Sequence, residues 1–225
     1  NLYLLKKTVF EGKVAGNLEI KGTDDTPDIR GNILVYNAYM VRPIPNSDKA
    51  TIKLSFLGDK LNLDVKVPTS PDQTVYVKGP INLYNDKSAD LKITSTDNVD
   101  LKTAQIVLNP LHEILHFELG PVPIMDIKGK GGIDLRIVGT RLNPHGWGQF
   151  YFKDAIVSFL DIHNMEIRNS SGTLDIDNQN TLFQSKTANL NGKPISVKGT
   201  CSLLGVLNFD VLTKGQDIGK LLNTV

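Results

Sequence analysis

The sequence predicts an all-β fold, and three observations support this prediction. Apolar and polar residues alternate with a period of two through most of the chain, as they do in strands with one dry and one wet face. Clusters of Gly, Asn, Asp and Pro separate the alternating segments, as turns do. Helical periodicity is scarce. This spacing predicts about fifteen short strands, in a chain of 225 residues that can bury a substantial apolar core.

The clearest alternation lies in residues 51–56 and 61–67, on either side of Gly58, Asp59 and Lys60. These two segments predict a hairpin with one apolar face and one polar face. The same period returns along the rest of the chain. The alternating apolar residues are Val75/Val77, Ile81/Leu83, Leu91/Ile93, Ile133/Leu135/Ile137, Phe150/Phe152, Leu174/Ile176 and Ile195/Val197.

Two stretches favour a short helix. In residues 109–120, Asn109 can cap the helix, Pro110 suits its first position and Gly120 can end it. The second stretch is 216–222, near the end of the sequence. Neither stretch is long enough to cover a sheet.

An internal repeat relates two distant parts of the chain. The segment from Leu18 to Thr23 recurs as Leu135 to Thr140, and the landmarks that follow keep the same spacing. The matched landmarks are Gly22 and Gly139, Pro27 and Pro144, Gly31 and Gly148, and Ala38 and Ala155, each pair 117 positions apart. We therefore predict a structural repeat that relates residues 16–41 to residues 133–159.

Composition excludes some classes of function. The 25 Lys and Arg residues nearly balance the 24 Asp and Glu residues, and no basic block is present, so nucleic acid is not an expected partner. The single cysteine, Cys201, cannot form an internal disulfide and is interpreted as a small buried apolar residue. Apolar runs such as 155–157 are too short to cross a bilayer, and the sequence shows no signal-peptide pattern. We expect the chain to be part of a longer protein whose membrane anchor or export signal lies outside this sequence.

A sheet with one apolar face must place that face against something. Without long helices, three arrangements remain: a sandwich, a closed barrel, or a trough whose lining meets an apolar guest. About fifteen strands in one curved sheet would extend for about 70 Å. Such a trough would expose more apolar surface than soluble monomers usually tolerate. Periodicity does not separate the three, and the sandwich is the simplest because it needs no ligand.

The repeated segments carry a resemblance to a known family. They read GNLEIKGTDDTPDIRGNILVYNA and GGIDLRIVGTRLNPHGWGQFYFKDA, each a strand that ends in Gly-Thr and is followed by Pro, Gly and a second alternating strand. This layout resembles the repeat of the AsmA-like family, especially the TamB-type repeat. The likeness covers residues 12–41 and 129–205, and residues 51–108 are compatible with it. The insertion at 109–123 departs from the family pattern.

The resemblance implies a fold and a function. The expected fold is one long, curled, mainly antiparallel sheet, a half-pipe or β-taco with an apolar concave face, spanning residues 1–225 as one continuous groove segment. The expected parent is a protein anchored in the inner membrane of a Gram-negative envelope, with this segment in the periplasm. Bridge-like lipid transfer proteins share this design. The implied function is non-enzymatic transport of phospholipid between membranes and assistance in outer-membrane assembly. The implied partners are phospholipid acyl chains, adjoining segments of the parent chain and an outer-membrane protein.

One motif points to a different class of protein. His112, Glu113 and His116 form HExxH, in which two histidines on one helix face bind zinc and the glutamate acts on the bound water. The motif lacks the extended form, and neither Asp126 nor Glu166 stands out as a third ligand. We interpret it as an accident of sequence and expect no metal and no cofactor, with a zinc peptidase kept as a remote alternative.

The remaining candidate residues have simple interpretations. His145, in a Pro-His-Gly turn, and His163, in a strand, are isolated from other metal-ligating residues. Trp147 is interpreted as an aromatic plug where a strand begins, or as a ring at a groove rim that contacts lipid head groups. No nucleotide-binding or nucleophile motif is present, so we expect no enzyme activity.

These observations predict the residues that line an apolar groove. The alternation places every second side chain of each strand on the same face. The predicted lining residues are Ile52, Leu54, Phe56, Leu61, Leu63, Val65, Ile133, Leu135, Ile137, Phe150, Phe152, Ile195 and Val197. The alternative prediction is a structural or adhesive sandwich or solenoid that carries no lipid.

Overall fold

The structure, a computed structural model, describes only part of the chain. The described residues are 10–23, 25–40, 50–84, 88–102, 125–140, 143–159, 166–178, 180–190, 193–202 and 207–213. Nearly all of them lie in antiparallel strands, which confirms the all-β prediction. The helices predicted at 109–120 and 216–222 lie outside the described residues.

Thirteen strands are present in this part of the chain, against about fifteen predicted from the pattern. They are β1 (Phe10–Gly22), β2 (Pro27–Met40), β3 (Ala50–Gly58), β4 (Lys60–Ser70), β5 (Gln73–Asn82), β6 (Ala89–Ser95), β7 (Val99–Asp100), β8 (Met125–Thr140), β9 (Asn143–Phe159), β10 (Glu166–Asn178), β11 (Asn180–Leu190), β12 (Lys193–Ser202) and β13 (Leu207–Thr213).

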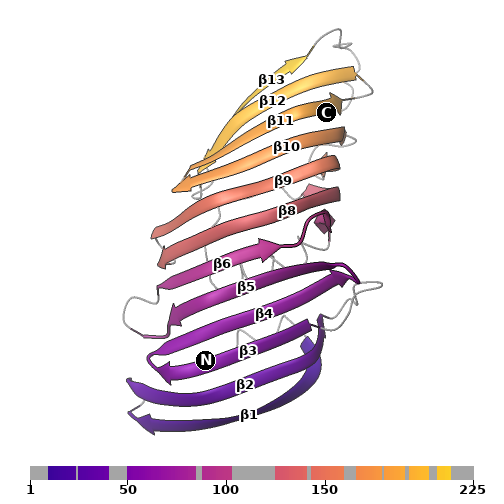
Figure 1. The fold of residues 1–225 in the computed structure, drawn as a ribbon. Helices are drawn as coiled ribbons and strands as arrows, with labels where there is room; N and C mark the ends of the chain where they lie inside the picture. The colour runs from indigo at the N-terminus through magenta and orange to yellow at the C-terminus, as the bar shows by residue number, and fades with distance from the viewer. Residues whose placement is uncertain are drawn as a thin grey trace.

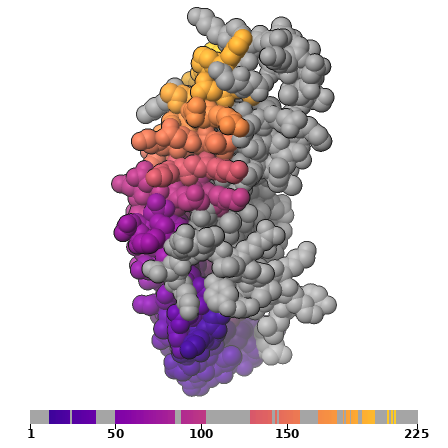
Figure 2. Space-filling view, turned by 90° about the vertical axis from the view of Figure 1, so that its right-hand side faces the viewer, coloured from indigo at the N-terminus to yellow at the C-terminus, as the bar shows by residue number. Residues whose placement is uncertain are grey.

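All these strands belong to one antiparallel sheet whose order follows the chain. Each strand pairs with the next from β1 to β6 and from β8 to β13, β6 pairs with β8, and the short β7 also pairs with β8. Figure 1 shows β1 and β13 at opposite ends of the sheet, so the sheet is open. From the side, the strands form one continuous band of colour from indigo to yellow (Figure 2). The described strands are therefore not divided between the two stacked sheets of a sandwich.

The register gives the sheet one apolar face. Residues directly opposite each other in neighbouring antiparallel strands point to the same side. Ile33 lies opposite Leu54, and Leu54 lies opposite Leu63. In the second half of the sheet, Phe150 lies opposite both Ile133 and Leu174. We call the side that carries these residues the apolar face and the other side the polar face.

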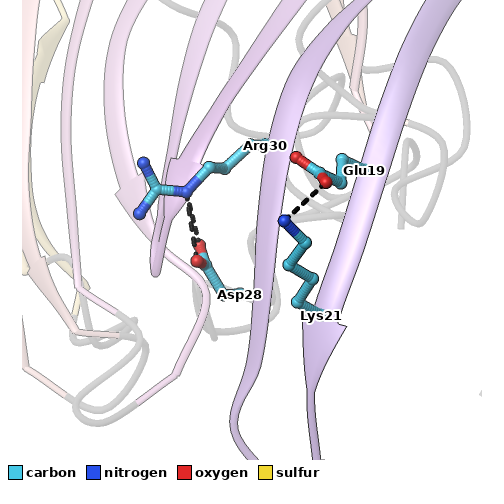
Figure 3. Close-up of polar contacts among 4 residues, drawn as sticks. All are labelled: Glu19, Lys21, Asp28 and Arg30. Carbon is cyan, nitrogen blue, oxygen red and sulfur yellow. Dashed lines mark hydrogen bonds and ion pairs between the residues drawn. The ribbon is translucent and has the colours of Figure 1, made fainter.

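Ion pairs between exposed side chains occupy the polar face. On β1, Lys21 lies 2.6 Å from Glu19, and on β2 the Nε of Arg30 lies 3.0 Å from Asp28, as Figure 3 shows. Further pairs link neighbouring strands. They are Lys78–Asp64 at 3.2 Å, Lys92–Asp134 at 3.6 Å and Arg136–Asp90 at 2.8 Å. Solvent screens such exposed pairs, so each stabilises the fold only weakly.

The backbone repeats itself between the hairpins β1–β2 and β8–β9. Gly22 pairs with Pro27, as Gly139 pairs with Pro144. Both hairpins have a register shift at corresponding positions, between Glu11 and Lys13 and between Lys128 and Lys130. In the facing strands, Asn37 has φ 55° and Asp154 has φ 50°. The alanine that follows is buried in both, Ala38 at 2% exposed and Ala155 at 1%.

The correspondence continues through the following strands. Leu54 opposite Leu63 corresponds to Leu174 opposite Phe183. The next two strand pairs also agree in register, although the offset in sequence changes because the connections differ in length. The corresponding pairs are Leu63–Gly79 with Phe183–Gly199 and Val77–Ile93 with Val197–Val211. The sheet therefore consists of two six-strand units, a first unit of β1–β6 and a second unit of β8–β13.

Candidate functional site

All thirteen predicted lining residues lie in described strands, and the register places them on the apolar face. Phe56 lies opposite Leu61, and Ile52 lies opposite Val65. Strand pairing places the remaining lining residues on the same face. The pairs that connect them are Leu63–Gly79, Val77–Ile93, Ile93–Leu135, Ile133–Phe150, Phe150–Leu174, Leu174–Phe183 and Phe183–Gly199. Along β12, Val197 and Ile195 share the face of Gly199 because they alternate with it.

Burial varies along this row of side chains. Five lining residues are buried: Val65 and Phe152 are 8% exposed, Ile195 and Val197 are 7% exposed, and Ile133 is 4% exposed. The other eight are half-buried. The lining is therefore partly protected and partly accessible to solvent.

Four well-buried residues of this face were not among the predicted lining residues. Val75, Val77 and Leu91 are 0% exposed and Ile93 is 4% exposed. They lie in β5 and β6, at the centre of the sheet. Val75, Val77 and Ile93 pack with Val65 in one cluster, which we call the central cluster. Their alternation was visible in the sequence, but only the strand pairing shows that they continue the same face.

Glycines make room for an aromatic ring on the apolar face. Phe152 lies opposite Gly131 on one side and opposite Gly172 on the other. A Cβ atom at Gly172 would lie 2.9 Å from Cζ of Phe152, closer than real side chains approach. Leu101 packs against the ring together with Ala155. The phenylalanine ring therefore lies over Gly172 of the neighbouring strand, and Leu101 fills the corresponding space at Gly131.

The apolar face continues where β6 ends. Ile133 donates its backbone N–H to the Ser95 hydroxyl at 3.0 Å, and this hydroxyl donates to the Thr96 carbonyl at 2.8 Å. The chain then re-forms pairing with β8, with Val99 opposite Gly131. Val99 is 1% exposed and belongs to the central cluster, so β7 extends the lining.

The lining becomes exposed at the first edge of the sheet. On β1, Val14, Leu18 and Ile20 lie opposite β2 residues that belong to the apolar face. Val14 is 69% exposed, Ile20 is 65% exposed and Leu18 is 42% exposed. Isolated exposed apolar residues are ordinary, but three on one strand and one face form a patch that an apolar partner can cover.

On the polar face, Tyr151 of β9 contacts β8 and the turn between β6 and β7. The Tyr151 hydroxyl donates to Asp97 at 2.8 Å and accepts the backbone N–H of Asn98 at 3.4 Å. Its ring occupies the space beside Gly132, where a Cβ atom would collide with it. Partial burial raises the pKa of Tyr151, and the hydrogen bond to Asp97 raises it further. The contact fixes the turn between β6 and β7 against β9.

A bidentate ion pair joins the two units. The Arg136 guanidinium donates to both carboxylate oxygens of Asp90, at 2.9 Å and 2.8 Å. This hydrogen bonding, with a smaller charge attraction, holds the pKa of Asp90 below its ordinary value, against a small opposing effect of burial. The pair lies on the polar face, outside the lining.

His145 and Trp147, which the sequence singled out, lie on the polar face. His145 and Trp147 stack with ring centroids 6.3 Å apart, and His145 hydrogen-bonds the Asn178 side chain. The prediction that His145 lies in a turn is wrong: residue 145 belongs to β9 and pairs with Val138. Trp147 is 43% exposed and lies opposite Arg136, near the beginning of β9.

The zinc motif is not tested by the structure, because His112, Glu113 and His116 lie outside the described residues, as does His163. Its two imagined further ligands, Asp126 and Glu166, both lie opposite Ser158 in neighbouring strands. Within the described ranges, no group of three His, Cys, Asp or Glu side chains could hold a metal ion.

The described residues include no helix with the length and apolar character needed to cross a membrane. Cys201 lies in β12, opposite Thr181 and Leu207.

Comparisons of the chain with known protein families, with curated protein sequences and with solved structures found no match.

Proposed function

We propose that this chain is a non-enzymatic lipid-conduit segment, in which phospholipid acyl chains lie along the apolar face. The observation that carries this proposal is the continuity of that face: apolar residues from every strand column share it, from the exposed Leu18 and Ile20 on β1 to Val197 on β12.

The physical mechanism is passive. Burying one methylene group contributes about 0.8 kcal/mol, so an acyl chain gains stability in proportion to the length that is covered. The lining is chemically uniform along Leu54, Leu63 and Leu135, so neighbouring positions along the sheet bind a chain about equally well. Charged head groups remain in water. Movement along the face then needs no energy-consuming step within this segment.

The proposal extends to the shape and setting of the segment. The sheet is curled into a half-pipe, the parent protein resembles the AsmA-like family with its TamB-type repeat, and the segment lies in the periplasm of a Gram-negative envelope. Its partners are adjoining segments of the parent chain and an outer-membrane protein. Nucleic acid is not a partner, and no cofactor takes part.

Matched substitutions by aspartate test the proposed face. Leu135→Asp and Phe56→Asp place a charge on the half-buried lining, and Leu18→Asp places it on an exposed position of the same face. Leu57→Asp is the control, because Leu57 is 62% exposed on the polar face. Native mass spectrometry after incubation with phosphatidylethanolamine vesicles measures bound lipid.

We expect lipid on the unmodified chain and on Leu57→Asp, at least about tenfold less lipid on Phe56→Asp and Leu135→Asp, and a smaller loss on Leu18→Asp. A charge reversal at the exposed Lys53 is expected to leave binding unchanged. Far-UV circular dichroism checks that each variant is folded, and Leu18→Asp keeps the test valid if the two half-buried variants unfold. Equal lipid on all variants would refute the assignment of the face.

A second candidate function is a structural or adhesive β module, and the central cluster favours it. Val75 and Val77 in this cluster are 0% exposed, as in an ordinary protein core. A module of this kind would carry no lipid in the native mass spectrum. The remote alternative of a zinc peptidase predicts near-stoichiometric zinc by elemental analysis and its loss in His112→Ala.

A further inference from the structure

The junction between the two six-strand units is built from β6 and β8. On the apolar face, Leu91 lies opposite Ile137 and Ile93 lies opposite Leu135. On the polar face, the Asp90–Arg136 pair crosses the same junction at 2.8 Å. One unit therefore continues into the next through an ordinary antiparallel strand pair.

Each end of the sheet presents one half of this junction. β1 occupies the place in the first unit that β8 occupies in the second, and β13 corresponds to β6 in the same way. β6 and β13 are also equally long, with 7 residues each. Among the residues that the structure describes, no strand pairs with the outer side of β1 or of β13.

The apolar side chains of β1 are exposed because no described strand lies on its outer side. Leu18 and Ile20 are 42% and 65% exposed, whereas the corresponding Leu135 and Ile137, which have β6 beside them, are half-buried. At the other end, Leu212 on β13 is 72% exposed, but it lies opposite Ser196 on the polar face. Unpaired edge strands with exposed apolar residues readily take up another strand.

The directions of the strands permit continuation between molecules. The sheet has twelve columns in antiparallel order, so β1 and β13 run in opposite directions. Placing β13 of one copy beside β1 of another therefore gives an antiparallel pair, with the apolar faces of both copies on the same side.

We propose that copies of this chain associate head to tail, with β13 of one copy pairing with β1 of the next and repeating the β6–β8 junction. The register follows from the junction within the chain. Phe209 of one copy lies opposite Ile20 of the next, and Val211 lies opposite Leu18. The association is heterologous and does not close, so it builds a series of oligomers instead of a single dimer.

This register also has a like-charge pair. Asp210 of β13 lies opposite Glu19 of β1, in the place where Lys92 lies opposite Arg136 within the chain. Lys21, which pairs with Glu19 at 2.6 Å, offsets part of the repulsion. Glu19→Lys should therefore strengthen the association, because it places a cation opposite Asp210.

Sedimentation velocity of the full chain over a range of concentrations tests the association. We expect a concentration-dependent series of oligomers, a dissociation constant about tenfold lower for Glu19→Lys, and one about tenfold higher for Ile20→Lys. Leu57→Lys is the matched control, since Leu57 is 62% exposed but lies on β3, away from both edges. A chain that stays monomeric at every concentration overturns the proposal.

Disulfide cross-linking tests the register and the partner strand. In a Cys201→Ser background, Glu19→Cys and Asp210→Cys are prepared as separate proteins, mixed and mildly oxidised. We expect covalent heterodimers from the mixture and none from Leu57→Cys mixed with Asp210→Cys. Homodimers of Glu19→Cys without heterodimers would show β1 pairing with β1 and overturn the head-to-tail proposal. This result does not depend on lipid, so it is separate from the test of the proposed function.

Discussion

β1 and β8 are two strands with the same place in a repeated unit and different surroundings. They share their register with the following strand, a register shift at the same point, and a leucine at corresponding positions, Leu18 and Leu135. β8 has strands on both sides, whereas the described residues place a neighbour on only one side of β1. Leu135 is half-buried and packs against the central cluster, and Leu18 is 42% exposed.

The difference shows that burial on this sheet comes from neighbouring strands more than from the strand itself. Each additional column covers the side chains of the column before it. The apolar face is therefore best protected in the middle of the sheet, where Val75 and Val77 are 0% exposed, and least protected at β1.

The largest expected effect separates the two leucines. Leu135→Ala should lower the free energy of unfolding by about 2–3 kcal/mol, because it leaves a cavity beside the central cluster. Leu18→Ala removes the same atoms from a position that water already reaches, so we expect less than about 1 kcal/mol. Urea unfolding measures both, and equal losses would show that the second neighbouring strand adds no protection.

A smaller effect should be the same in both units. Asn37 and Asp154 have positive φ, where the side chain of alanine is strained. We expect Asn37→Ala and Asp154→Ala each to destabilise the fold by about 1 kcal/mol, and the glycine variants to be neutral. Thermal unfolding compares the four variants. A loss of stability at only one site would show that the register shifts of the two hairpins are not equivalent.

The smallest expected effect concerns pH at the junction between the units. The pKa of Asp90 is lowered in the folded protein by the hydrogen bonds from Arg136, so the stabilisation is fully present above the ordinary value of 3.8. It is lost as the pH falls below 3.8 through the lowered pKa. Because the pair is exposed, the change in stability should be smaller than that of the Asn37 and Asp154 variants. Asp90→Asn should flatten this part of the pH profile of unfolding, and an unchanged profile would contradict the assignment.

Much of the fold could be predicted from the sequence because it depends on local signals. Period-two alternation located the strands and the turn residues separated them, and the hairpin around Gly58 has its strands where the pattern placed them. The repeat was visible at Gly22 and Pro27 because a strand end and a strand start each need a particular residue type. The open, single-sheet topology depends on pairing between strands, which no local pattern shows.

The candidate site was predicted in part for the same reason. Alternation shows which residues of a strand share a face, but not which faces of different strands coincide. Val77 and Ile93 were therefore recognised as strand residues without being assigned to the lining. His145 shows the opposite error: proline and glycine beside it indicate a turn locally, but pairing with Val138 and contact with Asn178 hold it in a strand. Tertiary pairing outweighed the local preference.

The order of the strands has a consequence for how the chain reaches its folded state. Apart from the β6–β8 pair, every pair of neighbouring strands along the main order of the sheet is also consecutive in the sequence. Contacts between residues close in sequence form quickly, because little chain entropy is lost in closing each loop. A newly emerging polypeptide can therefore add one hairpin at a time to an existing edge, without waiting for its far end to appear.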